Sequence, residues 1–366
     1  MAKVHGSVLA LLVVGASLVC CSGTSSNGGS GEGDDGGGGT SSGGLNSSNG
    51  GNSSGGSSGT SSSSGSGDDT SSSGTSSSGT TSSSGSSSGT TKHDAGASSS
   101  GSSSGSSSGV TTSGAAPIVP AAMGTCPTLA TGMITVSGQQ VQIWAGTKGS
   151  KPAPVFFYWH GTGSSSSEAE AFMSSEISEI TSEGGVFASF TTSTAAGMDT
   201  GDAVWYTGDF AMADQILACA VQQLNIDTRQ VYTGGCSAGG LQSGAMLFAR
   251  SNYIAAAMPN SGGEVIAGEY PLEGKHVPSL ITTHGAPGSD VVVIDFSKTS
   301  ATEDMDVVSK GGFAVDCNHG GGHCGAPAPD IAAQWAFCKA HPFGVSPDPY
   351  ASGLPSSFPS YCTIIK

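Results

Sequence analysis

Charged side chains are scarce in this sequence of 366 residues. Asp, Glu, Lys and Arg together make up 10% of the chain, and the 11 basic residues are outnumbered by 27 acidic ones. Residues 117–366 contain 21 acidic and 9 basic side chains, so nucleic acids and anionic surfaces are repelled on average. The composition therefore excludes a nucleic-acid partner and disfavours a phosphate-bearing substrate, while neutral molecules remain acceptable.

Long apolar runs are also lacking, apart from Val8 to Val19 near the N-terminus. That run follows Lys3 and is too short to span a bilayer, so it predicts an export leader over residues 1–21. Leu18-Val19-Cys20-Cys21 resembles a bacterial lipoprotein cleavage box, which implies lipidation of Cys21 and a lipid anchor in a bacterial membrane. Plain secretion stays open as the alternative, because Cys20 stands where such boxes usually carry Gly, Ala or Ser.

Residues 22–116 contain almost only Gly, Ser and Thr, with short acidic interruptions. Such a segment buries too little apolar surface to offset its ordering entropy, so it is predicted to be a disordered tether with an end-to-end distance of roughly 50–60 Å. Residues 117–366 are enough for one globular domain. We expect that domain to be a monomer.

Strand-like and helix-like patterns alternate through residues 117–366, which indicates an α/β domain with a largely parallel sheet and helices on both of its faces. The expected strands are 134–136, 141–144, 155–159, 186–190, 231–233, 255–258, 280–283 and 313–315. The expected helices are 168–183, 210–224, 238–250, 292–310 and 330–340, the last followed by a proline-rich tail.

The most informative motif is Gly235-Cys236-Ser237-Ala238-Gly239, which lies between the strand expected at 231–233 and the helix expected at 238–250. A serine on a sharp strand-to-helix turn has a strained backbone, and glycines on both sides let the two arms of the turn pass each other. The pattern predicts a nucleophile elbow that exposes Ser237 at the carboxyl edge of the sheet.

A nucleophilic serine needs a base and an orienting acid, which follow it in the order Ser, Asp, His in hydrolases with such an elbow. Asp290 lies on a glycine-rich loop after the strand expected at 280–283. His323 follows three glycines after the strand expected at 313–315. The predicted triad is therefore Ser237, Asp290 and His323, with Asp295 and Asp316 as the alternative acids.

An oxyanion hole takes one backbone N–H from the residue after the nucleophile and another from the loop after an early central strand. The first donor is predicted to be Ala238. The strand expected at 155–159 leads directly into His160-Gly161-Thr162-Gly163. Gly161 or Thr162 is therefore the predicted second donor.

These motifs, in this order, resemble those of secreted esterases with the α/β-hydrolase fold. The group comprises feruloyl and acetylxylan esterases of carbohydrate esterase family 1 and the related polyhydroxybutyrate depolymerases. The resemblance covers roughly residues 133–342, including the 160–163 loop, Cys236-Ser237-Ala238-Gly239-Gly240 and Gly321-Gly322-His323. It implies an α/β-hydrolase fold and hydrolysis of a carboxylic ester, without specifying the ester.

One detail resembles tannases and fungal feruloyl esterases, in which the cysteine before the catalytic serine forms a disulfide with the cysteine after the catalytic histidine. Cys236 and Cys324 occupy those positions, so the resemblance implies a bridge between them. With Cys20 and Cys21 removed or lipidated, seven cysteines remain, and at least one thiol is free or intermolecular. The pairing of the other five stays open: Cys126, Cys219, Cys317, Cys338 and Cys362.

No metal or cofactor is predicted. His319 and His323 have the spacing of two zinc ligands on a helix, but the three glycines between them disfavour a helix. His160 and His284 are expected to support loops and not to transfer protons. Trp205 and Tyr206 could line a cleft, yet aromatic side chains pack in cores more often than they bind ligands.

Three functional classes remain for this predicted extracellular or cell-surface protein. The first is an esterase acting on feruloyl or acetyl groups of polysaccharides, and the second is a polyhydroxyalkanoate depolymerase; both take an ester substrate that we expect to be polymeric. The third is a non-catalytic surface protein on a hydrolase scaffold, which would be expected to have lost a triad residue. Acyl transfer to an alcohol instead of water also stays open.

Overall fold

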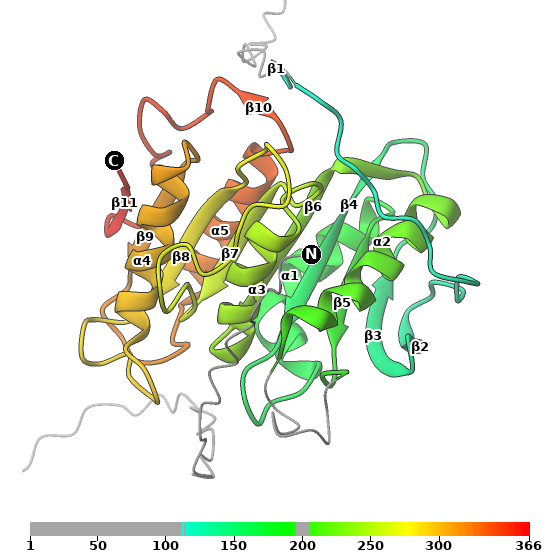
Figure 1. Cartoon of the computed structure of the whole chain (residues 1–366), viewed down its shortest axis with the longest axis horizontal. Helices are drawn as coiled ribbons and strands as arrows, with labels where there is room; N and C mark the ends of the chain where they lie inside the picture. Colours follow the sequence, from blue (N-terminus) through cyan, green and yellow to red (C-terminus); the bar gives the residue numbers. More distant parts are fainter. Residues whose placement is uncertain (1–110, 113, 195–204) are drawn as a thin grey trace, which may run out of the picture. The chain divides into compact units, whose positions relative to one another are not determined.

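The structure is a computed structural model that describes residues 111–112, 114–194 and 205–366 (Figure 1). The predicted leader, with the predicted lipidation site at Cys21, lies outside these residues. Residues 22–110 of the predicted tether also lie outside them. None of the helices in the described part of the chain combines the length and the apolar character needed to cross a membrane.

The main sheet of the described residues has nine strands in the order β11-β9-β8-β7-β6-β4-β5-β3-β2. The six strands β4 to β9 run parallel to one another, while β2, β3 and β11 are antiparallel strands towards the two edges. The strands are β2 (Gly132–Val136), β3 (Gln139–Ala145), β4 (Ala153–Trp159), β5 (Val186–Phe190), β6 (Ile226–Cys236), β7 (Ala256–Asn260), β8 (Ser279–His284), β9 (Ala314–Asn318) and β11 (Cys362–Ile364). A separate short pair joins β1 (Thr111–Thr112) to β10 (Val345–Ser346).

Helices cover both faces of this sheet (Figure 1). Apolar side chains of α1 and α5 form one core layer with the sheet, and those of α2, α3 and α4 form the layers on the other face. The helices are α1 (Ser167–Ser182), α2 (Phe210–Gln223), α3 (Ala238–Ala249), α4 (Phe296–Ser309) and α5 (Ala328–Ala340), and a 3₁₀ turn, η1 (Thr207–Asp209), precedes α2.

The central strands are buried on both faces, which explains why they appear in the sequence as continuous and not alternating apolar runs. Every residue of β4, β5, β7 and β8 is buried. The predicted alternation of strands and helices, with a largely parallel sheet, is therefore confirmed.

One element prediction was wrong, and two short strands of the tail were not predicted. The helix expected at 292–310 begins only at Phe296, because Val291, Val292 and Val293 are β-branched residues that disfavour a helix, and Val291 instead forms a bridge with Asp295. The proline-rich tail also contributes β10 and β11. The edge strand β11 pairs with β9 and is tied to it by the disulfide Cys317–Cys362.

Disulfides account for six of the seven cysteines in residues 117–366. Besides Cys317–Cys362, the bridges are Cys126–Cys219 and Cys236–Cys324. Cys338 is buried and is the free cysteine of the described residues. The expected free thiol is therefore Cys338, and burial raises its pKa.

Candidate active site

Ser237 lies on the turn between β6 and α3 with φ 58° and ψ −121°. A positive φ is rare for a residue with a side chain and costs on the order of 1–3 kcal/mol, which indicates a constrained functional position. A Cβ on Gly235 would lie 2.2 Å from the Trp159 carbonyl oxygen, and one on Gly239 only 1.7 Å from it. Glycine at both positions is therefore required for β6 and α3 to pass next to β4.

The N-terminus of α3 lies directly after this serine. Ala238 is the first residue of the helix, and the first N–H groups of a helix have no intrahelical acceptors and favour negative charge. The Ser237 N–H is already used, since it donates to the Asn260 carbonyl over 3.0 Å. The Ala238 amide is thus in the position expected of the first oxyanion donor.

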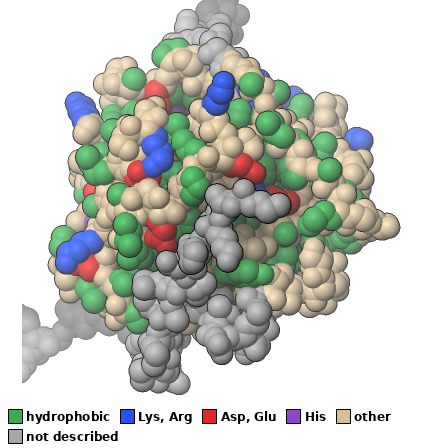
Figure 2. All heavy atoms as spheres, in the orientation of Figure 1, with side chains coloured by type: hydrophobic (Ala, Val, Ile, Leu, Met, Phe, Trp, Pro, Cys, Tyr) green, Lys and Arg blue, Asp and Glu red, His purple; other side chains and the backbone are tan. Residues whose placement is uncertain are grey.

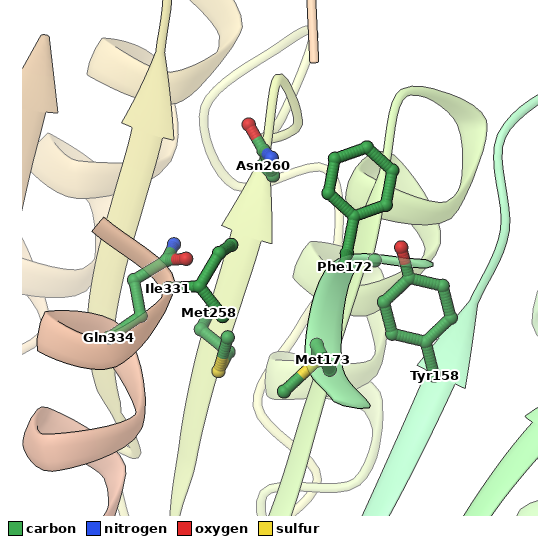
Figure 3. Close-up of a pocket in the computed structure, with 8 residues that line it drawn as sticks. Tyr158, Phe172, Met173, Met258, Asn260, Ile331 and Gln334 are labelled. Atoms are coloured by element: carbon green, nitrogen blue, oxygen red, sulfur yellow. The ribbon is translucent and has the colours of Figure 1, made fainter. Parts of the chain in front are cut away.

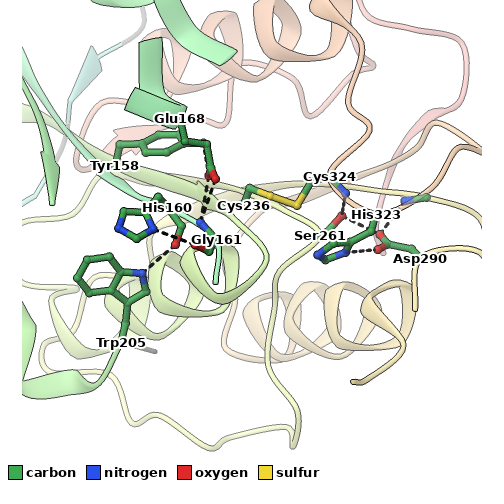
Figure 4. Close-up of a disulfide and its surroundings, with 11 residues drawn as sticks. Tyr158, His160, Gly161, Glu168, Trp205, Cys236, Ser261, Asp290, His323 and Cys324 are labelled. Atoms are coloured by element: carbon green, nitrogen blue, oxygen red, sulfur yellow. Dashed lines mark hydrogen bonds and ion pairs between the residues drawn. A yellow bond between two sulfur atoms is a disulfide. The ribbon is translucent and has the colours of Figure 1, made fainter. Parts of the chain in front are cut away.

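The structure pairs His323 with Asp290 (Figure 4). His323 Nδ1 and Asp290 Oδ1 are 2.7 Å apart, and the carboxylate is completely buried. The imidazole is about a quarter exposed and packs against the Phe296 ring, with centroids 4.5 Å apart. Because Nδ1 faces Asp290, Nε2 is the ring nitrogen left for chemistry.

Asp290 is held by further donors. The Gly285 N–H and the Ser261 hydroxyl both donate to Oδ2, over 2.9 and 2.8 Å. Burial alone raises the pKa of Asp290, but the hydrogen bonds from His323, Gly285 and Ser261 outweigh it and lower that pKa below its usual value. The carboxylate is therefore stabilised in its charged form beside the imidazole.

The two alternative acids have other partners. Asp316 Oδ1 lies 2.7 Å from His284 Nε2, and this partner, against the opposing effect of burial, raises the pKa of His284. Asp295 accepts from Ser297 and lies 3.2 Å from Lys298 at the start of α4. Neither carboxylate bonds His323 in this structure.

The disulfide Cys236–Cys324 connects the two catalytic loops (Figure 4). It joins the residue before Ser237 to the residue after His323, across 88 positions of sequence. Cys324 also donates its N–H to Ser261 Oγ over 2.8 Å. The nucleophile loop, the histidine loop and the aspartate are thus cross-linked through neighbouring residues.

The 160–163 loop also lies next to Ser237, and its two candidate donors differ. The Gly161 N–H donates to both carboxylate oxygens of Glu168, over 3.1 and 3.2 Å. Thr162 is exposed. Because the Gly161 amide is engaged, we favour Thr162 as the second oxyanion donor.

His160, which was expected to support a loop, and Trp205 both stabilise the 160–163 loop. His160 is buried, with its ring nitrogens 2.8 Å from the Gly161 carbonyl and 2.9 Å from that of Thr191. The Trp205 indole donates to the His160 carbonyl over 2.9 Å and is 8% exposed. Trp205 is thus a core residue behind the loop, whereas its neighbour Tyr206 is exposed.

A small pocket lies beside the elbow, between α1 and α5 (Figure 3). The space open to the centre of a water molecule is about 10 Å³, which is about what one water needs. An acyl chain therefore has no room in it. The pocket is lined by Tyr158, Phe172, Met173, Gly235, Met258, Asn260, Ile331 and Gln334.

Within the described residues, no group of three or more His, Cys, Asp and Glu side chains is arranged to hold a metal ion. His319 Nδ1 accepts from the Gly321 N–H over 3.1 Å, within its own loop. His319 therefore supports the glycine-rich turn that presents His323.

Sequence reasoning missed two residues of this site, Ser261 and Glu168. Ser261 follows β7 at the same sheet edge as the elbow, and the following Gly262-Gly263 was the available signal. Glu168 lies in the first turn of α1, and nothing in its spacing from Gly161 indicated a contact.

No family model matches this sequence, and no curated protein matches it. Among solved structures, a variant of pOPH in complex with pNPB is 17% identical with a TM-score of 0.50, over 66% of this chain and 96% of that one. Native sOPH is 16% identical with a TM-score of 0.49, over the same shares. Apo esterase 2 of Thermogutta terrifontis is 15% identical with a TM-score of 0.40, over 54% of this chain and 86% of that one.

At these identities the similarity concerns the fold alone, and of these three structures the pOPH complex reaches a TM-score of 0.50. That similarity agrees with the sheet order, the helices on both faces and the serine at the turn after β6. The chain therefore has the α/β-hydrolase fold.

Proposed function

We propose that this protein is a serine esterase that hydrolyses carboxylic esters with Ser237, His323 and Asp290. The observation that carries the proposal is a strained serine on a strand-to-helix turn, linked by a disulfide to a loop whose histidine is paired with a buried carboxylate. Nucleophile, base and orienting acid follow the chain order of the fold.

In the first half of the reaction, His323 Nε2 takes the proton of Ser237 while Oγ attacks the ester carbonyl carbon. The carbonyl oxygen becomes an oxyanion, which accepts hydrogen bonds from the Ala238 and Thr162 amides. The tetrahedral intermediate collapses, the bond from carbon to the alcohol oxygen breaks, and His323 returns the proton to the leaving alcohol. Ser237 is then acylated.

In the second half, water replaces the alcohol. His323 removes a proton from the water as its oxygen attacks the acyl carbon, and the second tetrahedral intermediate expels Ser237, which recovers the proton. The carboxylic acid leaves. Throughout, Asp290 holds the imidazole by Nδ1 and stabilises its charged form, in keeping with its lowered pKa.

The leading substrate class is feruloyl or acetyl esters of polysaccharides. Support comes from the motif resemblance and from a surface poor in charge, since a neutral polymer is not repelled by an acidic domain. On the face in Figure 2, charged side chains are few and scattered among polar and hydrophobic ones.

The second candidate is a depolymerase of a hydrophobic polyester, which one specific feature favours. Val291, Val292 and Val293 directly follow Asp290 and are 48%, 45% and 61% exposed. Val265 and Ile266 are also exposed, after Glu264, whose N–H bonds Thr299 in the first turn of α4. Exposed apolar residues in loops beside a catalytic acid suit adsorption to an insoluble polyester.

We also propose export of the chain, with a lipid on Cys21 and a tether over residues 22–110, since Thr111–Thr112 of the expected 22–116 tether form β1. Three disulfides in the described residues support an oxidising compartment. Mass spectrometry of the protein purified from bacterial membranes would show the lipid on Cys21 if the anchor exists, whereas an unmodified chain in the medium would contradict it.

The test of the function is a panel of esters assayed with the full chain produced under oxidising conditions: p-nitrophenyl butyrate, methyl ferulate, acetylated xylan and a polyhydroxybutyrate suspension. Release of ferulate or acetate supports the polysaccharide esterase, and clearing of the suspension supports the depolymerase. Ser237→Ala is expected to be inactive yet folded. If the wild-type protein hydrolyses none of the four substrates, the result would contradict the proposal and favour a non-catalytic surface protein.

A further inference from the structure

Glu168 places a carboxylate beside the nucleophile that the reaction steps above do not use. Its Oε1 accepts from the Tyr158 hydroxyl over 3.0 Å, and both of its oxygens accept from the Gly161 N–H (Figure 4). In each of these hydrogen bonds Glu168 is the acceptor, which is the role of a carboxylate.

The carboxylate of Glu168 lies close to the reacting serine. A Cβ built on Gly161 would be 3.4 Å from Ser237 Cβ and 3.5 Å from Glu168 Oε2. The sum of those distances limits the separation of Glu168 Oε2 and Ser237 Cβ to about 7 Å. The Glu168 carboxylate and the reacting serine are therefore neighbours on either side of Gly161.

Neither hydrogen-bond donor neutralises that charge. The Gly161 N–H is a neutral amide, and Tyr158 stays protonated, because burial and then the Glu168 charge raise its pKa well above the usual value. Among the described residues, no Lys, Arg or His forms a salt bridge with Glu168. The negative charge of Glu168 therefore acts on groups bound at Ser237, where the oxyanion adds a second negative charge.

We propose that Glu168 is a specificity-determining residue that restricts this site to esters with an uncharged acyl group. The inference rests on the proposed esterase function. A second carboxylate, on an acyl chain bound at Ser237, would be repelled by Glu168 in both the ground state and the transition state. For two charges about 7 Å apart at an effective dielectric constant near 20, the repulsion lowers kcat/KM by a factor on the order of tens. Esters with acetyl, feruloyl or hydroxyalkanoyl groups are not repelled by Glu168 and remain substrates, whereas hemiesters of dicarboxylic acids are repelled.

The test compares p-nitrophenyl crotonate with mono-p-nitrophenyl fumarate, whose acyl chains have equal length and differ by one terminal carboxylate; the trans double bond keeps that carboxylate from attacking its own ester. We expect the full-length wild-type protein to prefer the crotonate by more than tenfold in kcat/KM, after division by the hydroxide-catalysed rate of each ester. Glu168→Gln keeps the size of the side chain and should reduce that preference by about tenfold. Glu168→Asp keeps the charge and should retain most of it.

Glu170→Gln is the matched control, because it removes the same charge from an exposed position two residues further along α1. Its preference should equal that of the wild type. A wild-type protein that hydrolyses both esters equally well would overturn the inference without any variant. Equal losses on both esters in Glu168→Gln would also overturn it, since they would show that Glu168 only positions the 160–163 loop. Failure of the wild type on both esters would instead count against the esterase function itself.

Discussion

The Ser261 hydroxyl lies between Asp290 and Cys324: it donates to Asp290 Oδ2 over 2.8 Å and accepts from the Cys324 N–H over 2.8 Å. It thereby connects the orienting acid to the residue that follows the base. Ser261 is completely buried and has a φ of 45°, so its backbone is held in a strained conformation that places the hydroxyl between these partners.

Ser261→Ala should therefore impair catalysis more than binding. Removing the hydroxyl leaves a buried carboxylate with one donor fewer and costs about 1.5–3 kcal/mol of stability. We expect kcat to fall roughly tenfold or more with little change in KM, because the imidazole is held less firmly. Steady-state kinetics and thermal unfolding measure both effects.

Ser243→Ala is the control for that variant, since Ser243 is equally buried but its hydroxyl bonds the Gly240 carbonyl within α3. It should lose some stability while keeping kcat. A Ser261→Ala protein with wild-type kcat would show that the Asp290 contact does not contribute to catalysis.

The Cys236–Cys324 disulfide is predicted to matter for activity as well as stability. In the chain-entropy account, closing a loop of this length stabilises the fold by roughly 4–5 kcal/mol. Replacing both cysteines by serine should lower the melting temperature and reduce kcat, because the loops of Ser237 and His323 lose their covalent link.

The disulfide Cys126–Cys219 provides the comparison, since neither of its cysteines is adjacent to a triad residue and it closes a loop of similar length, 93 residues against 88. Its double serine variant should be less stable but retain kcat at a temperature where it is folded. Equal kcat losses in the two variants would argue against a specific catalytic effect of Cys236–Cys324.

Gly239 has no room for a side chain, because an added Cβ would lie 1.7 Å from the Trp159 carbonyl oxygen of β4. Gly239→Ala must displace β4 or the first turn of α3, so we expect loss of soluble protein or loss of activity by several orders of magnitude. Gly149→Ala serves as the control, since its Cβ would have only ordinary contacts of 3.6 Å or more. Normal activity in Gly239→Ala would contradict the elbow geometry.

Stability should decrease as the pH rises from about 4.5 towards 8. Burial, followed by the neighbouring Asp306, raises the pKa of Glu264 from 4.5 to about 8. The folded protein thus holds a proton that the unfolded chain releases between these values. That stabilisation is complete below pH 4.5 and is lost as the pH rises towards 8.

Melting temperatures at pH 5, 7 and 9 test this prediction. The wild type should melt several degrees lower at pH 9 than at pH 5, and Glu264→Gln should show a smaller difference, because its amide does not titrate. Glu183→Gln, at an exposed position, should behave as the wild type does. An identical pH dependence in the wild type and Glu264→Gln would exclude Glu264 as the source.

The sequence predicts most of the framework because parallel strands buried on both faces leave continuous apolar runs and because the elbow needs glycine at fixed positions. The contacts of Glu168 and Ser261 could not be predicted in the same way. They depend on how the first turn of α1 and the end of β7 approach loops distant in sequence, and a single Glu or Ser carries no periodic signal. The start of α4 was missed because apolar content at 291–294 suggested a helix, whereas the β-branched side chains of the three valines oppose one.

The central claim is that Ser237 is the nucleophile, activated by His323. The most direct measurement is to treat the full-length protein with a fluorophosphonate, which bonds covalently to an activated serine, and to map the adduct by peptide mass spectrometry. We predict a single adduct on Ser237, no adduct in Ser237→Ala, and strongly slowed labelling in His323→Ala. An unlabelled wild-type protein, or an adduct on another serine with Ser237 unmodified, would contradict the assignment.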